Sequence, residues 1–137
     1  MNRTNAREYL MQMIYQMEAQ NDFSKDALDR FIELNIEEDD EKQIEYIKDV
    51  CDAFVSNKEE IDSSIEKYSK GWKLGRIAKV DLAVMRLCLA ESYYLPEEKK
   101  TPEGAAINEA VKLVKRFGTD DSGKFVNGIL GEISRNR

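Results

Sequence analysis

Residues 78–94 constrain the fold more than any other stretch of this 137-residue chain. Their side chains are hydrophobic on nearly every side of a helix, and only Asp81, Arg86 and Glu91 interrupt the pattern. A helix that is apolar all round must be covered by other elements. An unpaired buried charge is costly, so we expect Arg86 to form a structural ion pair or to cap carbonyls, with Asp81 at the rim. The segment predicts a central, enclosed helix.

Helical periodicity continues along the rest of the chain. Hydrophobic residues recur at i, i+3, i+4 and i+7 in six further segments, and only two prolines interrupt the sequence. Residues 105–130 give the most regular example, in which two such stripes flank a short acidic turn and predict an antiparallel helix pair. The fold class is therefore all-α: a single compact domain over residues 1–137, with about seven helices in two helical halves, about 1–70 and about 72–137.

Several residues mark where these helices begin and end. Side-chain oxygens favour helix starts, and glycine favours helix ends because it adopts a positive φ. The predicted starts are Ser24, the capping box of Ser56 and Glu59, Thr101 before Pro102, and Asp121 or Ser122, and the predicted positive-φ glycine is Gly118. Trp72 and Leu74, in a short bridge after Gly71, are expected to fill a gap between the two halves.

A run of five acids, residues 37–41, is interpreted as a linker that continues into the first turn of a helix. It lacks the glycine and the ligand spacing of a calcium-binding EF-hand loop. No metal site is therefore expected there.

Composition limits the classes of function. The chain has no histidine, so the commonest general base and metal ligand is missing, and no nucleophile elbow is visible. Cys51 and Cys88 stand among core-type residues, which indicates buried free thiols in a reducing cytoplasm. No apolar run is long enough to cross a membrane. We expect a cytoplasmic protein that is not an enzyme and uses no cofactor.

The loop from Gly118 to Lys124 imitates a phosphate-binding P-loop, G-x-x-x-x-G-K. The next residue is Phe125, so the hydroxyl that would hold Mg²⁺ is missing, and the preceding pattern is helical where a P-loop follows a strand. Two aspartates in the loop would also repel phosphate. Nucleotide binding is the less favoured reading.

One ridge of the first helix, residues 4–20, has a pattern compatible with RNA binding. Arg3, Arg7, Met11 and Tyr15 follow each other at i+4 and lie off the apolar face, where we expect them to be exposed. Cations can reach phosphates and a ring can stack on an unpaired base. A solvated face with a half-buried tyrosine explains the same pattern. The net charge of −6 argues against RNA binding over the whole surface, though not against a local basic patch.

The sequence resembles the bacterial NusB family of transcription antitermination factors over essentially its whole length. Two blocks carry most of the likeness, Ala106–Val111 and Lys124–Gly128, with the spacing between them. Weaker supporting matches are Ala6-Arg7-Glu8, Tyr15, Leu74–Ile77, Val84–Leu87, Phe117-Gly118 and Asp121-Ser122.

The resemblance implies a function that spacing alone does not give. NusB-like proteins bind single-stranded boxA RNA of nascent transcripts together with NusE, a small-subunit ribosomal protein. With RNA polymerase and other Nus factors the pair promotes transcription of ribosomal RNA operons. The implied RNA-binding residues are Arg3, Arg7, Tyr15, Lys124 and Phe125, and the implied protein-partner residues are Asp81 and Asp121.

Alternatives remain at this point. Phe125 could serve only the core, and the chain could be a helical adaptor that binds proteins and never touches RNA. A homodimer formed through the RNA-binding surface is equally compatible with the sequence. Family members often begin with several consecutive basic residues, whereas this chain has only Arg3 and Arg7, so its affinity for RNA without NusE is expected to be weak.

Overall fold

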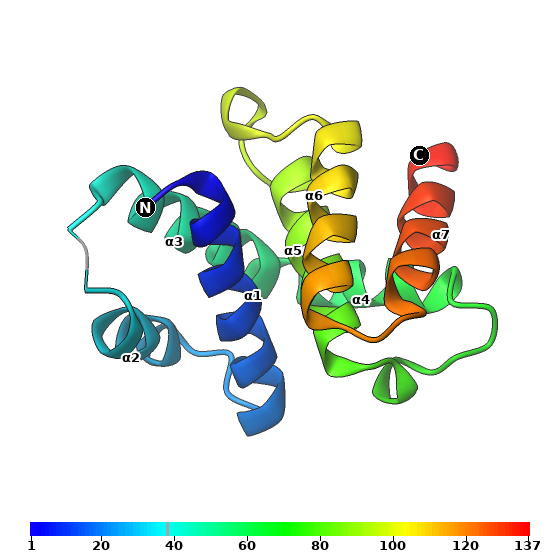
Figure 1. The fold of residues 1–137 in the computed structure, drawn as a ribbon, viewed down its shortest axis with the longest axis horizontal. Coiled ribbons are helices and arrows are strands. Elements are labelled where there is room, and N and C mark those ends of the chain that lie inside the picture. Colours follow the sequence, from blue (N-terminus) through cyan, green and yellow to red (C-terminus); the bar gives the residue numbers. More distant parts are fainter. Residues whose placement is uncertain (38) are drawn as a thin grey trace.

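The computed structural model describes residues 1–37 and 39–137. Within these ranges the chain is all-α, as predicted, and contains no strand (Figure 1). Two short 3₁₀ helices, η1 (Leu74–Arg76) and η2 (Glu97–Lys99), lie in connections. No described helix is long and apolar enough to cross a bilayer. The α-helices are α1 (Arg3–Gln20), α2 (Lys25–Asn35), α3 (Glu41–Ser56), α4 (Lys58–Lys67), α5 (Lys79–Tyr93), α6 (Glu103–Phe117) and α7 (Ser122–Arg135).

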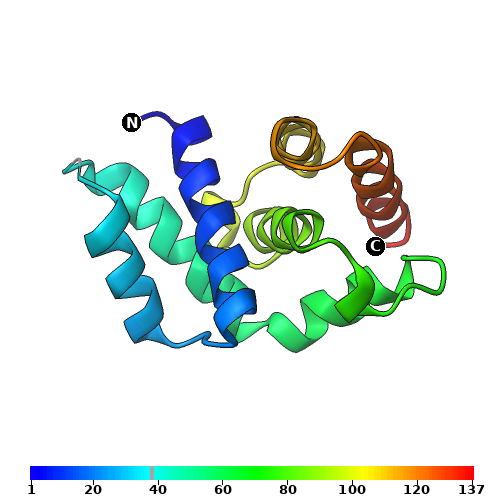
Figure 2. The ribbon, with the colours of Figure 1, turned by 60° about the horizontal axis from the view of Figure 1, so that its bottom comes forward.

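Helix α5 is the centre of the molecule. Its residues from Asp81 to Ser92 are all buried, and it packs against α1, α3, α4, α6 and α7. Figure 2 shows α5 nearly end-on, with α1 on one side, α6 and α7 on the other and α4 below. The prediction of an enclosed central helix is confirmed.

The other helices form two groups around α5. Helices α1, α2 and α3 pack together on one side, and the antiparallel pair α6 and α7 packs together on the other (Figure 1). Helix α4 follows α3 in the chain and packs on α5 and α7. The predicted division into halves of about 1–70 and about 72–137 stays a prediction.

Arg86 ties α5 to its neighbours. The side chain is fully buried, and its Nε and Nη2 each donate to a carboxylate oxygen of Asp62 in α4 at 2.8 Å. Its Nη1 donates to Glu18 in α1 at 2.6 Å. The guanidinium thus has the structural ion pair expected of a charge in a buried helix.

The predicted helix starts have mixed outcomes. Ser24 caps α2, because its Oγ accepts from the Ala27 amide at 3.1 Å. The capping box at Ser56 is wrong: α3 continues through Ser56, and Asn57 precedes α4 without a side-chain cap bond. Thr101 is also wrong as an N-cap, since Pro102 occupies that position and α6 begins at Glu103.

Gly118 has a negative φ of −96°, so the predicted positive φ is wrong. The residue is small for a different reason: an added Cβ would lie 2.5 Å from Ser122 Oγ and 2.8 Å from the Val114 carbonyl oxygen. Asp121 occupies the N-cap position of α7 but makes no cap bond, and Ser122 Oγ instead accepts from the Thr119 amide at 2.9 Å. Close approach therefore explains the glycine.

The acidic run leads into α3 as predicted. Helix α3 begins at Glu41, and the Asp40 carboxylate accepts from the Gln43 amide at 3.3 Å. Glu38 lies outside the described residues. Cys51 and Cys88 are free and buried, which confirms their prediction, and burial raises the pKa of the Cys51 thiol to about 12.

Candidate nucleic-acid interface

Arg7 is buried, and its predicted exposed position on the α1 ridge is wrong. Its Nε and Nη2 donate to the two carboxylate oxygens of Glu91 in α5 at 3.0 and 3.2 Å. Glu91 also accepts from the Tyr46 hydroxyl at 2.6 Å and from the Thr101 hydroxyl at 3.1 Å. The physical reason is that Glu91 is a buried carboxylate in the apolar helix α5. Burying its charge without a cationic partner would cost free energy, so Arg7 is drawn into the interior to pair with it.

Arg3 is partly exposed, and its guanidinium already contacts two neighbouring side chains. Its guanidinium carbon lies 3.8 Å from the centroid of the Tyr46 ring, and its Nε donates to Gln43 at 2.8 Å. Further along the same ridge, Met11 is buried, contrary to prediction, because it packs into the core. Tyr15 is 41% exposed, in agreement with its prediction. The ridge therefore offers a free ring and one partly available cation.

Lys124, Phe125 and Asp121 come together where α7 begins. Lys124 and Asp121 are exposed, whereas Phe125 packs partly against the core. All three line a groove of about 600 Å³, whose opposite wall includes Lys70 and Trp72 from the loop after α4. Phe125 thus has both a core contact and a face toward the groove.

Trp72 was predicted to fill a gap between the two halves. This is wrong, because its side chain is 52% exposed. It belongs to a loop that bends outward between α4 and α5. Sequence reasoning did not assign this loop to the site. The available signal was its charge pattern, since lysine or arginine recurs at every third residue from Lys67 to Lys79.

Asp81 lies beneath the surface and not at the rim of α5, since it is only 5% exposed. Its Oδ1 has no hydrogen-bond partner among the described residues. Burial raises the pKa of the Asp81 carboxyl, and the nearby Ser122 hydroxyl partly opposes that rise. The buried carboxyl therefore stands behind the first turn of α7.

The predicted RNA-binding residues form two groups. Tyr15 and Arg3 belong to α1, Lys124 and Phe125 belong to α7, and α6 lies between these helices in both ribbon views (Figures 1 and 2). An ion pair between Arg116 of α6 and Glu8 links α6 to α1. A ligand that touches both groups must be long enough to pass over α6, as a polynucleotide is.

Neither a metal centre nor a phosphate loop is found in the described part of the chain. No group of three or more His, Cys, Asp or Glu residues there is arranged to hold a metal ion. The segment Gly118–Lys124 follows α6 and not a strand, and its Gly123 and Lys124 already belong to α7. This geometry differs from the strand-loop-helix of a P-loop.

Comparison with known proteins decides the family. The model of the NusB family matches residues 4–135, nearly the whole chain. The chain belongs to the NusB family. The transcription antitermination protein NusB of Acetivibrio thermocellus is 45% identical over 134 residues, which cover 97% of this chain and 88% of the relative. That of Alkaliphilus oremlandii is 44% identical over 133 residues, covering 96% and 92%.

Solved NusB structures have the same fold. T. maritima NusB has a TM-score of 0.86 with 33% identity, covering all of this chain and 93% of the other. A structure of the antitermination factors NusB and NusE in complex with double-stranded RNA has a TM-score of 0.84 with 28% identity, covering 98% and 97%. The NusB fold is therefore established for this chain, including helix α7, which forms one wall of the groove.

Proposed function

We propose that this NusB-family protein binds single-stranded boxA RNA of nascent transcripts together with NusE. In the cytoplasm, the pair acts within an RNA polymerase antitermination complex that also contains other Nus factors. Its effect is to promote transcription of ribosomal RNA operons. The family supports antitermination, and a related NusB has been solved with NusE and RNA.

The observation that carries the RNA-binding proposal is the start of α7. Lys124 is exposed there, and Phe125 beside it lines the groove while resting on the core. A phosphate can bind the ammonium while an unpaired base stacks on the ring, at about 1–3 kcal/mol per stacked base. Since core packing orders the Phe125 ring in advance, less entropy is lost on binding.

The three predicted RNA-binding residues of α1 have different proposed roles. Tyr15 offers a second ring for stacking, and Arg3 offers a cation that is already oriented by Tyr46 and Gln43. Arg7 acts behind this surface, where its two bonds to Glu91 hold the first half of α1 against α5. An RNA strand contacts Arg3 and Tyr15 on α1 and reaches Phe125 by crossing α6.

The protein partner is proposed to bind beside the same turn. Asp121 is exposed and can accept hydrogen bonds from a partner. Asp81 is buried in α5, which packs on α7, and it contributes from behind that surface by supporting the packing of the two helices. Asp121 is thus a contact residue and Asp81 a positioning residue.

Fluorescence anisotropy with labelled boxA RNA tests the proposal. We expect the wild-type protein to bind the RNA more tightly when NusE is present and to prefer it to a scrambled sequence of equal length. Affinity should fall as salt rises, because phosphate contacts release counterions. Binding to NusE with no preference for boxA over the scrambled RNA would contradict the proposal and favour a protein-only adaptor.

A further inference from the structure

The loop between α4 and α5 concentrates positive charge in an acidic protein. Residues 67–79 contain five cations and no acid, although the net charge of the chain is −6. All five side chains are exposed, and none has a carboxylate within 4.0 Å in the described part of the structure. We name this segment the basic loop: Lys67, Lys70, Lys73, Arg76 and Lys79.

By comparison, the cations on and beside α1 already have partners within the protein. Arg7 is neutralised by Glu91, Arg116 pairs with Glu8, and Arg3 is stacked on Tyr46. A cation that already has a carboxylate partner gains little from a phosphate, because the existing pair must be broken. The basic loop therefore has the larger supply of charge available to a polyanion.

Local hydrogen bonds hold the basic loop in one conformation. The Ser69 hydroxyl lies 2.8 Å from the Glu66 carbonyl oxygen and 2.6 Å from that of Trp72, and the Trp72 amide donates to Ser69 at 3.2 Å. Lys70 and Gly71 close this turn with positive φ values of 53° and 88°. Exposed Trp72 is thus held at a defined position.

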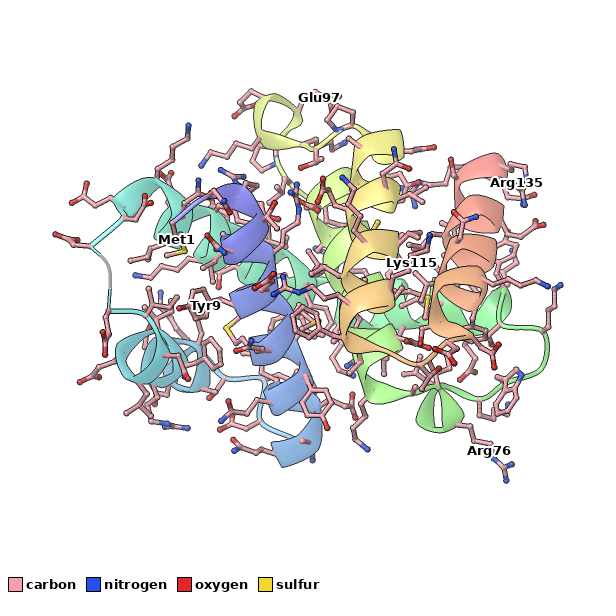
Figure 3. All side chains as sticks on the ribbon, in the orientation of Figure 1. Met1, Tyr9, Arg76, Glu97, Lys115 and Arg135 are labelled. Atoms are coloured by element: carbon pink, nitrogen blue, oxygen red, sulfur yellow. The ribbon has the colours of Figure 1, made fainter. Side chains whose placement is uncertain are left out.

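The basic loop borders the groove at the start of α7. Lys70 and Trp72 line that groove together with Lys124 and Phe125. The full lining has three aromatic rings, three cations and two carboxylates: Tyr68, Trp72 and Phe125, then Lys70, Lys124 and Arg135, then Asp121 and Glu132. Figure 3 shows Arg76 projecting outward from the body of the molecule. Aromatic rings and cations that share a groove are typical of surfaces that bind single-stranded nucleic acid.

We infer that the basic loop is a second RNA-binding surface, which binds phosphates of the unpaired transcript next to the bases held at Phe125. Trp72 stacks on a base of that flanking stretch, and Lys73 and Arg76 bind its phosphates. The inference rests on the proposed function and extends it: unpaired RNA adjoining boxA occupies the groove, and most of the salt-dependent affinity arises there.

The test compares two double variants of the full chain. Lys73→Gln with Arg76→Gln removes two exposed charges from the basic loop and leaves Lys70 alone, because its positive φ would add a backbone effect. Lys25→Gln with Lys48→Gln is the matched control, since these lysines are exposed and have no ion pair with any residue that the structure describes. They lie on α2 and α3, away from α7 (Figure 1). Circular dichroism checks that both variants fold.

The measurement is the slope of log affinity against log salt for boxA RNA with unpaired flanks. The basic-loop variant should reduce the slope by about 1.4, since each phosphate contact with single strands contributes roughly 0.7. The control variant should keep the wild-type slope. On boxA RNA without flanks, all three proteins should have similar slopes. Trp72→Ala should weaken binding of the flanked RNA several-fold without changing the slope.

Three results would overturn the inference. If wild type binds boxA and the basic-loop variant keeps its slope on flanked RNA, the second surface is wrong and the proposed function stands. If that variant loses affinity for NusE while its RNA slope is unchanged, the loop is a protein-binding surface. If wild type binds no unpaired RNA with or without NusE, both proposals fail.

Discussion

Arg86 shows how a single charged residue can hold three helices together. It is buried between Asp62 and Glu18, with three donor distances of 2.6–2.8 Å. Replacing it with methionine keeps much of the volume, but it leaves Glu18 without its cation and leaves Asp62 with only Lys58, at 3.0 Å. We expect Arg86→Met to lower the free energy of unfolding by about 3–5 kcal/mol, measured by urea denaturation.

The matched comparison for Arg86 is Arg30, whose ion pair with Asp22 is exposed. Arg30→Met should change the free energy of unfolding by only about 0–1 kcal/mol, because solvent screens surface pairs. Equal effects of the two substitutions would mean that the buried network does not stabilise the fold as argued.

Whether a charged side chain is buried and paired could be predicted only when the residues of its own helix determined it. Arg86 lies in an apolar helix, so a structural partner could be inferred from that helix alone. Arg7 has a favourable spacing for an exposed ridge, but its partner Glu91 is 84 positions away in the sequence. Helical periodicity carries no information about such a partner, and this explains why the ridge was predicted to have more free cations than it has.

Among the helices, the two predicted serine caps allow a direct comparison. Ser24 accepts from the Ala27 amide, whereas Ser56 is the last residue of α3 and caps nothing. We expect Ser24→Ala to lower the free energy of unfolding by about 1 kcal/mol. Ser56→Ala, on an exposed side chain, should change it by less than about 0.5 kcal/mol. Thermal or urea denaturation measures both, and a larger loss for Ser56→Ala would contradict the assigned helix ends.

Helix existence was easier to predict than helix ends. The apolar stripes of α1, α3 and α6 are long enough to identify each helix, since tertiary packing uses the same stripe. The ends depend on local hydrogen bonds and close contacts, and the presence of a serine or a glycine does not by itself determine these. Gly118, for example, was expected to adopt a positive φ, but the residue is small because Ser122 approaches it closely.

In the whole molecule, the enclosed helix α5 determines which surfaces remain free. Its neighbours cover it on all sides, so the ends of the helices and the loops are left to bind partners. The start of α7 lies beside the loop after α4, which joins residues about 50 positions apart around one groove. Sequence blocks identified the α7 side of this groove. The opposite side was missed because only the fold brings Lys70 and Trp72 there.

The central claim is that an unpaired RNA base binds at the start of α7, on Phe125. The most direct test is the affinity of Phe125→Leu for boxA RNA in the presence of NusE, with Phe31→Leu as the control in the buried core of α2. Both variants lose an aromatic ring from the packing, so unfolding curves supply the folded fraction of each. Per folded molecule, Phe125→Leu should bind RNA on the order of tenfold more weakly, and Phe31→Leu should match wild type. Unchanged affinity of folded Phe125→Leu would contradict the claim and leave Phe125 with a core role alone.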